Sequence, residues 1–360
     1  MNKSSWLLLL GMVLMLAGCA KKPQEIFEEQ KSGVVLICNQ FYYDITLYNG
    51  NHLYFSGLDD DGDFANLTAD LAEIKKSPGI LNGTGFFIDR SGRILTNRHV
   101  VAPQIDKDAV RKNVNAIIEG YASYIEVLQD SMNQRYQALQ AYAQQSVYED
   151  EEGNSYTSMS QEEASTLESE LESLRQQYSE AQELKNDIRS NILNNNFSIQ
   201  LHSEFGIAYD GSDMGSWDDF MKTPCRLLRV SQDANSDLAL LQLNKGATPQ
   251  DAYVFTIDDD NIAACEHLEI NQQLYMIGYN HGVTLAQTNS GISAQFTSGT
   301  VTQQPDGNRV MYSIPAMQGS SGSPIVDDHG RVVAVNFAGT NGSDNFNFGI
   351  PVLRVVTFIK

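Results

Sequence analysis

A change of apolar periodicity in the middle of the chain constrains the fold more than any other feature. Before residue 103 and after residue 196, short apolar runs alternate with turns that contain Gly and Asn, which is typical of antiparallel β structure. Between these regions, residues 104–196 carry apolar side chains three and four positions apart, as helices do. The sequence therefore predicts a β protein that is interrupted by a long helical insertion.

The insertion itself divides into two helices. One apolar stripe ends near Tyr142, and a second begins after a capping box at Ser160–Glu163, with polar residues 149–158 between them. Both stripes are narrow, so we expect the helices to bury them against each other as an antiparallel hairpin. Such a hairpin is either an embellishment of the surface or a contact for a substrate, a protein partner or a second copy of the chain.

Length and composition limit the classes of protein to consider. With 360 residues, the chain has room for about two domains. Apolar residues make up 42% and charged residues 19%, which describes a soluble globular protein. The net charge of -21 repels phosphate groups and argues against nucleic acid as a partner. Many short strands with glycine-rich turns predict barrels or a sandwich.

The N-terminus resembles a bacterial lipoprotein signal. A basic residue precedes an apolar run over residues 6–16, which is too short for a membrane span of about 20 residues, and small residues stand directly before Cys19. The resemblance implies that residues 1–18 are removed and that Cys19 is lipidated, with a tether over residues 19–32. The protein would then be a membrane-anchored lipoprotein of the bacterial cell envelope, facing the periplasm or the cell exterior. An ordinary secretory signal, with Cys19 incidental, is the alternative.

Three further cysteines, Cys38, Cys225 and Cys265, remain in a compartment where disulfides form. Their odd number permits at most one bridge, and their spacing matches no zinc site. One bridge with one free thiol and three buried thiols are both compatible with the sequence. We assign these cysteines no function.

Three short segments combine residue types that carry out nucleophilic catalysis. Thr96–Val100 places His99 at the end of a predicted β-hairpin, where the backbone fixes its position. Ser236–Ala239 places Asp237 at the start of a strongly apolar strand, where a carboxylate is poorly solvated. Gly319–Pro324 holds three serines among glycines that allow a tight bend.

In this order, the three segments resemble those of the chymotrypsin-like serine proteases, most closely the bacterial HtrA/Deg type. The likeness covers the β regions and omits the helical insertion. Four further segments match the family in order: Ile277–Tyr279, Ser298–Val301, Val335–Asn336 and Phe348–Pro351. The resemblance implies a mainly β protein of two antiparallel β-barrels with the active site between them, and with the helical hairpin inserted in the first barrel.

Domain boundaries follow from this resemblance. The first barrel is expected in two parts, over residues 33–103 and 197–248, around the insertion at residues 104–196, and the second barrel over residues 249–360. HtrA relatives usually carry a PDZ domain after the protease. Because the sequence stops at Lys360, we expect no such domain here.

The resemblance also gives each candidate catalytic residue a role. Ser321 would be the nucleophile, His99 the base that takes its proton and later protonates the leaving amine, and Asp237 the acid that orients His99. Asp233 is a poorer candidate for the acid because it precedes the apolar strand by four residues. The backbone N–H groups of Gly319 and Ser321 would form the oxyanion hole.

Two serines depart from the family pattern. Ser320 stands where relatives have Asp or Asn, and Ser323 stands where they usually have Gly. Ser321 is favoured as the nucleophile because it alone lies between the bend-forming residues Gly319 and Gly322.

The resemblance further places the pocket for the residue before the cut bond. Its base would come from the residues before the nucleophile loop and its wall from one strand: Pro315, Ala316, Met317 and Gln318, and Asn336, Phe337, Ala338 and Gly339. None is charged, so a basic side chain would be buried unpaired, whereas burying an apolar one gains roughly 1.5–3 kcal/mol. We expect cleavage after Ala, Val, Leu or Met, unless Asp344 reaches into the pocket and favours basic residues.

The sequence thus favours a lipid-anchored serine endopeptidase that cuts polypeptides, unfolded proteins among them, through an acyl-enzyme and without a metal or organic cofactor. Four of the five residues 59–63 are aspartates, but Phe64 stands where a calcium loop requires Gly, so we expect a solvated turn. The alternative is a catalytically inactive protease fold that binds partners through its helical hairpin, because Ser320 and Ser323 could disturb the oxyanion loop.

Overall fold

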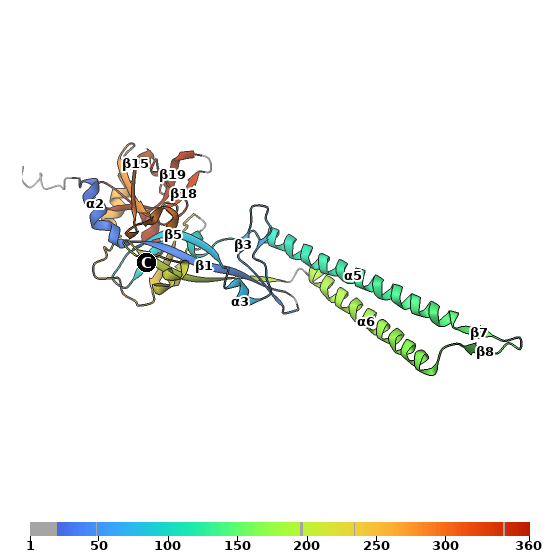
Figure 1. Cartoon of the computed structure of the whole chain (residues 1–360). Helices are drawn as coiled ribbons and strands as arrows, with labels where there is room; N and C mark the ends of the chain where they lie inside the picture. The colour runs from blue at the N-terminus through green and yellow to red at the C-terminus, as the bar shows by residue number, and fades with distance from the viewer. Residues whose placement is uncertain (1–19, 48, 195–196, 234, 341–342) are drawn as a thin grey trace, which may run out of the picture. The chain divides into compact units, whose positions relative to one another are not determined.

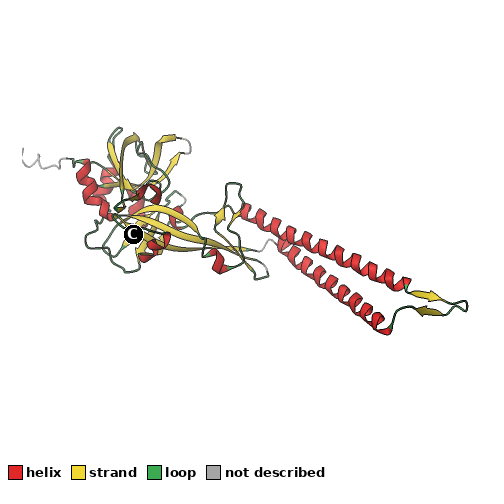
Figure 2. Cartoon of the chain, viewed as in Figure 1, coloured by secondary structure: helices red, strands yellow, loops and turns green. Residues whose placement is uncertain are grey.

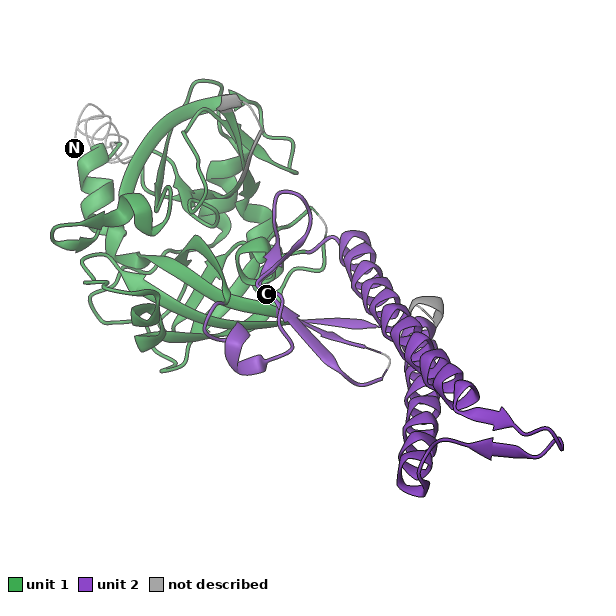
Figure 3. Cartoon of the chain, turned by 45° about the vertical axis from the view of Figure 1, so that its right-hand side comes forward, with its two compact units in different colours: residues 1–42, 78–104, 201–360 green, residues 43–77, 105–200 purple. Residues whose placement is uncertain are grey.

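The computed structural model describes residues 20–47, 49–194, 197–233, 235–340 and 343–360 (Figure 1). Cys19, with its predicted lipidation, lies outside these residues. The chain divides into two compact units: residues 1–42, 78–104 and 201–360 form unit 1, and residues 43–77 and 105–200 form unit 2 (Figure 3). Strands dominate unit 1, and two long helices dominate unit 2 (Figure 2).

Six antiparallel strands form the first barrel, in the order β1-β5-β6-β11-β10-β9, and β9 also pairs with β1. They are β1 (Val34–Thr46), β5 (Gly79–Phe87), β6 (Arg93–Thr96), β9 (Ser198–Tyr209), β10 (Pro224–Val230) and β11 (Ala239–Leu243). Alternate side chains of a strand point to one face, and here that face fills the barrel with fully buried Ile37, Phe87, Ile94 and Leu241.

The second barrel also closes from six antiparallel strands, in the order β12-β15-β16-β19-β18-β17. They are β12 (Gln273–Gly278), β15 (Gln295–Gln303), β16 (Val310–Tyr312), β17 (Pro324–Val326), β18 (Val332–Thr340) and β19 (Ser343–Pro351). Leu274, Met276, Ile325 and Val333 fill it. The prediction of two antiparallel barrels with a long helical insertion is confirmed.

Short elements complete unit 1. They are α2 (Pro23–Gln30), η1 (Lys31–Gly33), α4 (Arg98–Val101), η2 (Trp217–Lys222), α7 (Asp259–Glu266), α8 (Val283–Ala286), β13 (Gln287–Thr288), β14 (Gly291–Ile292) and α9 (Val352–Ile359). The three cysteines of unit 1, Cys38, Cys225 and Cys265, are all free and buried, so of the two arrangements that the sequence left open the structure has three buried thiols.

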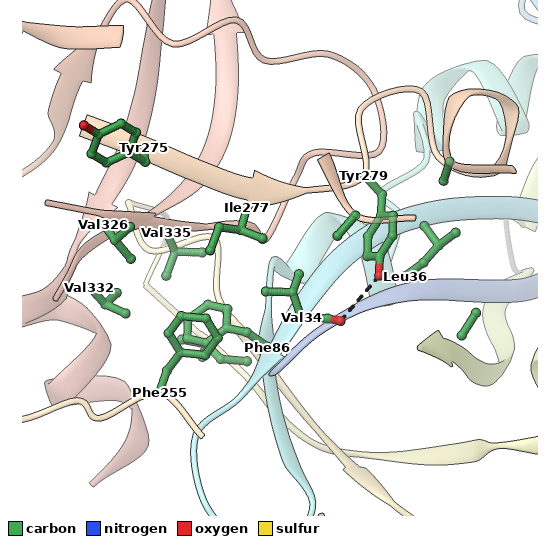
Figure 4. Packing of buried hydrophobic residues seen from close by; sticks show 14 of the residues in the cluster. Val34, Leu36, Phe86, Phe255, Tyr275, Ile277, Tyr279, Val326, Val332 and Val335 are labelled. Carbon is green, nitrogen blue, oxygen red and sulfur yellow. Dashed lines mark hydrogen bonds between the residues drawn. The ribbon is translucent and has the colours of Figure 1, made fainter. Parts of the chain in front are cut away.

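A hydrophobic cluster joins the two barrels within unit 1 (Figure 4). Val34 and Phe86 come from the first barrel, and Ile277 and Val335 come from the second. Tyr279, fully buried at the end of β12, donates a hydrogen bond from its hydroxyl to the carbonyl oxygen of Val34, 3.4 Å away (Figure 4). Burial raises the pKa of this phenol, so the hydroxyl stays protonated and remains a donor.

The segment expected to be a tether contains a packed helix. In α2, Ile26 is fully buried, and Gln30 donates from Nε2 to the carbonyl oxygen of Gly330, 2.6 Å away. The sequence of α2 is amphipathic and has a proline in its first turn, which suits a helix start. Residues 23–30 are therefore part of the folded unit rather than a linker, which corrects the expectation for residues 19–32.

Unit 2 is built around the predicted helical hairpin. Helix α5 (Lys107–Gln145) and helix α6 (Gln161–Asn194) are antiparallel, since Arg135 pairs with Glu170 near one end and Lys185 pairs with Glu126 nearer the other. The capping box at Ser160–Glu163 forms as expected. The polar break between the helices contains a small strand pair, β7 (Val147–Glu149) with β8 (Ser155–Thr157).

On α5 the buried side chains of the seam lie in the half near the base, whereas Leu167 of α6 is buried farther along the hairpin. On α5 the buried residues are Val110, Val114, Ile118, Ala122, Ile125 and Gln129, and none follows Gln129 in that helix. Gln129 is itself hydrogen-bonded to Gln182 and Lys185 of α6. Among the described residues, no helix is long and apolar enough to cross a lipid bilayer.

Residues 43–77 group with the helices rather than with the first barrel, to which we assigned them. They form β2 (His52–Phe55), β3 (Gly57–Leu58), β4 (Phe64–Ala65) and α3 (Leu71–Ile74). Asn113 of α5 donates to the carbonyl oxygen of Gly62, 2.7 Å away, which ties the β3–β4 turn to the helix. The first barrel is therefore interrupted twice, and the two excursions form one compact unit.

Candidate active site

His99 and Asp237 are brought together by strand pairing. β6 ends at Thr96 and β11 begins at Ala239, and these two residues are register partners, so the residues just beyond them are neighbours. The Nδ1 atom of His99 is hydrogen-bonded to Oδ2 of Asp237. The backbone N–H of His99 donates to Oδ1 of the same carboxylate at 3.0 Å. One carboxylate therefore fixes both the ring and the backbone of the histidine.

The residues beside this pair hold Asp237 in place. Asn97, fully buried, donates from Nδ2 to the carbonyl oxygen of Asp237 at 2.8 Å, and the backbone N–H of Arg98 donates to the same oxygen at 3.2 Å. The side chain of Asp237 is 16% exposed and that of His99 is 43% exposed, so the carboxylate is enclosed while the ring is open to solvent on one side. Asp233 pairs instead with Arg354, at 2.9 Å.

A concavity of about 490 Å³ lies next to the pair. Three of its wall residues, Leu81, Pro103 and Phe337, are apolar. The full lining is Leu81, Arg98, His99, Pro103, Gln104, Asp237 and Phe337. The exposed side of the imidazole therefore faces a space that a side chain of a polypeptide can enter.

The three serines of the nucleophile loop lie in different environments. Ser320 is 1% exposed, and its hydroxyl donates to the carbonyl oxygen of Met317 at 2.6 Å. Ser323 is fully buried, and its hydroxyl has no hydrogen-bond partner. Ser321 is partly exposed, and within the described part of the chain its hydroxyl makes no hydrogen bond, to His99 or to any other residue. Of the three, only the Ser321 hydroxyl is both accessible and uncommitted.

Hydrogen bonds to the carbonyl oxygens of this loop orient its peptide groups. The carbonyl oxygen of Gln318 accepts from the backbone N–H of His281 at 2.6 Å, and that of Ser320 accepts from Nδ2 of Asn336 at 3.0 Å. In a trans peptide the C=O and the following N–H point in opposite directions. The N–H groups of Gly319 and Ser321 therefore point away from these contacts, and neither has an acceptor among the described residues.

Glycine is required at residue 319 of this loop. Gly319 has a φ of +96°, and a Cβ atom there would lie 2.4 Å from the backbone nitrogen of Gly282. Both the backbone conformation and the close approach of the chain exclude other residues without rearrangement.

The predicted pocket residues divide into two groups. Pro315, Met317 and Gln318 are exposed, Ala316 is partly exposed, and Phe337 lines the concavity. Asn336 is 2% exposed, accepts at Oδ1 from the hydroxyl of Tyr312 at 2.7 Å, and supports the nucleophile loop from inside the barrel. The side chain of Ala338, and Gly339 beyond its backbone pairing with Asn347, lie outside what the structure describes.

One group of side chains in the described part of the chain has ligand atoms close enough together to hold a metal ion. Among the described residues, Asp327, Asp328 and His329 bring their ligand atoms close together. The Asp327 carboxylate, however, accepts from Arg331 at 2.6 Å, and Asp328 is paired with His329. In the acidic turn at residues 59–63, the backbone N–H groups of Asp61 and Asp63 donate to Oδ1 of Asp59, at 3.0 and 2.9 Å.

Comparison with known proteins supports a peptidase. Residues 218–335 match the family model of the trypsin-like peptidase domain. The matched segment includes Asp237 and Ser321 and begins after His99. No curated protein matches the chain.

One solved structure that resembles this fold is the crystal structure of the serine endoprotease from Yersinia pestis, with 12% identity and a TM-score of 0.44. The alignment covers 95% of this chain and 66% of that one, so this chain spans about 66% of the length of that protein.

Proposed function

We propose that the protein is a serine endopeptidase in which His99, Asp237 and Ser321 form the catalytic triad. The observation that carries the proposal is the double contact between Asp237 and His99, with the ring exposed beside a concavity. The match of residues 218–335 to a trypsin-like peptidase domain supports the same reaction class.

The proposed reaction uses groups of the chain itself. His99 takes the proton of the Ser321 hydroxyl as its oxygen attacks the carbonyl carbon of the substrate peptide bond. The resulting oxyanion accepts hydrogen bonds from the N–H groups of Gly319 and Ser321. His99 then gives the proton to the leaving amine, and an acyl-enzyme remains on Ser321. Water, activated by His99, hydrolyses the acyl-enzyme and regenerates the serine.

For the residue before the cut bond we propose small or medium apolar side chains. Pro315, Ala316, Met317 and Phe337 offer apolar surface, and burial of an unpaired charge against them would be costly. A peptide library should show Ala, Val, Leu or Met at this position. Dominance of basic residues would refute the assignment and direct attention to Asp344.

We further propose that Cys19 is lipidated and anchors the enzyme in the bacterial cell envelope, where polypeptides, unfolded proteins among them, are its substrates. The support is the apolar run followed by small residues and cysteine. Cys19→Ser should move the protein from the membrane fraction to the soluble fraction or leave the precursor uncut, because acyl chains supply the membrane affinity. Unchanged membrane association, without lipid labelling of the native protein, would refute this part.

A second candidate is a protease fold without activity that binds partners through its hairpin. The observation in its favour is a group of exposed apolar side chains on α5, Tyr121, Tyr124 and Val127. In this case the hydrolytic groups would be remnants, and Ser321 would not react with active-site reagents.

Labelling with a fluorophosphonate separates the two candidates. The wild-type protein should be labelled and should cut casein, and Ser321→Ala should lose both, with hydrolysis reduced by about 10⁶-fold. Ser323→Ala is the matched control, because its buried hydroxyl has no partner and its loss should leave activity largely unchanged. Absence of labelling in a folded wild-type protein would favour the binding role.

A further inference from the structure

Thr84 lies on β5 of the first barrel and is not itself one of the groups that the proposed reaction uses. It is fully buried and is paired with Leu36 of β1 in the sheet. Glycines flank it on both sides, and a Cβ at either would lie 2.6 Å from a neighbouring side chain, Val100 at Gly83 and Ile94 at Gly85. A buried hydroxyl at such a crowded place needs hydrogen-bond partners to offset its desolvation.

The partners of the Thr84 hydroxyl are in the second barrel. Its Oγ1 donates to the carbonyl oxygen of Gly319 at 2.8 Å and accepts from the backbone N–H of Tyr279 at 3.1 Å. Its own backbone N–H donates to the carbonyl oxygen of Ser321 at 2.8 Å. One residue of the first barrel therefore holds the two residues whose N–H groups would form the oxyanion hole.

Thr84 also restricts the C-terminal end of the nucleophile loop. A Cβ on Gly322 would lie 2.1 Å from the carbonyl oxygen of Thr84, and that oxygen accepts from the hydroxyl of Thr96 at 2.7 Å. β5 is thus fixed by a contact within the first barrel, and it in turn holds the nucleophile loop of the second barrel. Loss of the Thr84 hydroxyl would free Gly319 and Tyr279 at once.

We propose that Thr84 is a positioning residue for the oxyanion hole: its hydroxyl fixes Gly319 so that the N–H groups of Gly319 and Ser321 converge on one point. The inference rests on the proposed peptidase function. Thr84 is buried and touches no substrate, so it acts through the loop. Donors that are already in place at the moment of reaction stabilise the transition state more than the ground state.

Thr84→Val tests the role of the hydroxyl at nearly constant volume. We expect kcat for a short peptide substrate to fall about 10- to 100-fold, below the 10²–10³ loss typical of a missing oxyanion donor, with KM changed by less than about threefold. Affinity for a peptide boronic acid, which mimics the tetrahedral state, should fall by a similar factor. Affinity for the corresponding product peptide should stay the same. Thr84→Ser, which keeps the hydroxyl, should recover most of the activity.

Thr297→Val is the matched control. Its hydroxyl is also buried in the second barrel but has no hydrogen-bond partner, so the variant should keep wild-type kinetics. If Thr84→Val does not fold, Thr84→Ala and Thr84→Ser replace it, compared at a temperature where both are native by circular dichroism.

The outcomes separate the inference from the function on which it rests. If the wild-type protein cuts peptides and Thr84→Val keeps wild-type kcat, or loses affinity for boronic acid and product equally, the positioning role is wrong. Failure of Thr84→Ser to recover activity would also overturn it. If the wild-type protein neither cuts peptides nor reacts with fluorophosphonate, the peptidase function is wrong, and the inference is rejected with it.

Discussion

The nucleophile loop and the helical hairpin are held by different kinds of contact. In the loop, the carbonyl oxygens of residues 318–321 are all hydrogen-bonded to groups of other segments, namely His281, Thr84 and Asn336. In the hairpin beyond Gln129, α5 buries no side chain, and the contacts include ion pairs of long side chains on the surface, such as Arg135 with Glu170. Main-chain contacts fix positions closely, whereas surface ion pairs contribute little and tolerate movement. We therefore expect the loop to be sensitive to small changes and the hairpin to tolerate large ones.

The largest effect is expected from Gly319→Ala. The residue has a φ of +96° and a Cβ there would contact the backbone of Gly282 and Tyr279, at 2.4 and 2.5 Å. Strain and overpacking each cost about 1–3 kcal/mol, so the free energy of unfolding should fall by a few kcal/mol and peptide cleavage should be lost. Urea unfolding and a peptide assay measure the two effects. A variant with normal activity would show that the loop is less constrained than its contacts indicate.

Removal of the hairpin should have a smaller effect on the barrels. Replacement of residues 107–194 by a short flexible linker should leave the melting temperature of unit 1 and the cleavage of short peptides nearly unchanged, because the apolar clusters of the two barrels consist of unit 1 residues. Cleavage of long protein substrates should decrease if the hairpin contacts them. Loss of short-peptide cleavage would contradict the proposed independence. No change in protein cleavage, oligomeric state or partner binding would make the hairpin an embellishment.

Gly120→Ala is the counterpart of Gly319→Ala in the hairpin. Gly120 lies within α5, is exposed, and a Cβ there would meet no atom within 4 Å. Alanine has a higher helix propensity, so the substitution should raise the stability of unit 2 by about 1 kcal/mol. Thermal unfolding followed by circular dichroism in the helical region tests this. A loss of stability would indicate that Gly120 contacts another molecule, because a Cβ at this position meets no atom of the chain itself within 4 Å.

The smallest effect is expected when the native protein is treated with a thiol reagent. Burial raises the pKa of Cys38 and Cys225 to about 12 and that of Cys265 to about 11. Since burial favours the neutral thiol and the thiolate is the reactive form, native protein at pH 8 should react negligibly with a thiol reagent. All three thiols should react in urea. Because all three lie in unit 1, the same slow labelling in the variant without the hairpin would show that the barrels remain closed.

The comparison also shows where sequence reasoning succeeds. The helices follow from periodicity within each segment, and the neighbouring positions of His99 and Asp237 follow from two apolar strands, β6 and β11, that end beside each other. These inferences need only local patterns or one strand pairing. The structure places both residues as the sequence suggested, and the catalytic roles stay predictions.

Long-range polar contacts could not be predicted in this way. Thr84 and Gly319 are 235 positions apart, and a threonine between two glycines gives no sign of its partner. Asn336 was expected to line the pocket, but nothing in an apolar strand indicates that one amide would turn inward toward Ser320. The two glycines at residues 83 and 85 were the available signal, since paired glycines in a strand indicate that other chain segments approach closely.

The length of the hairpin sets a distance. At 1.5 Å per residue, the 39 residues of α5 extend about 58 Å. The strand pair β7–β8 therefore lies at a defined distance from the base of α5. Removal of seven residues from each helix would shorten the hairpin by about 10 Å and rotate the strand pair about the helix axis by only about 20°. Removal of five would turn it by about 140°. The length of the hairpin and the orientation of its strand pair can thus be changed separately. Variants with different helix lengths would therefore show how far from the base of the hairpin a contact occurs.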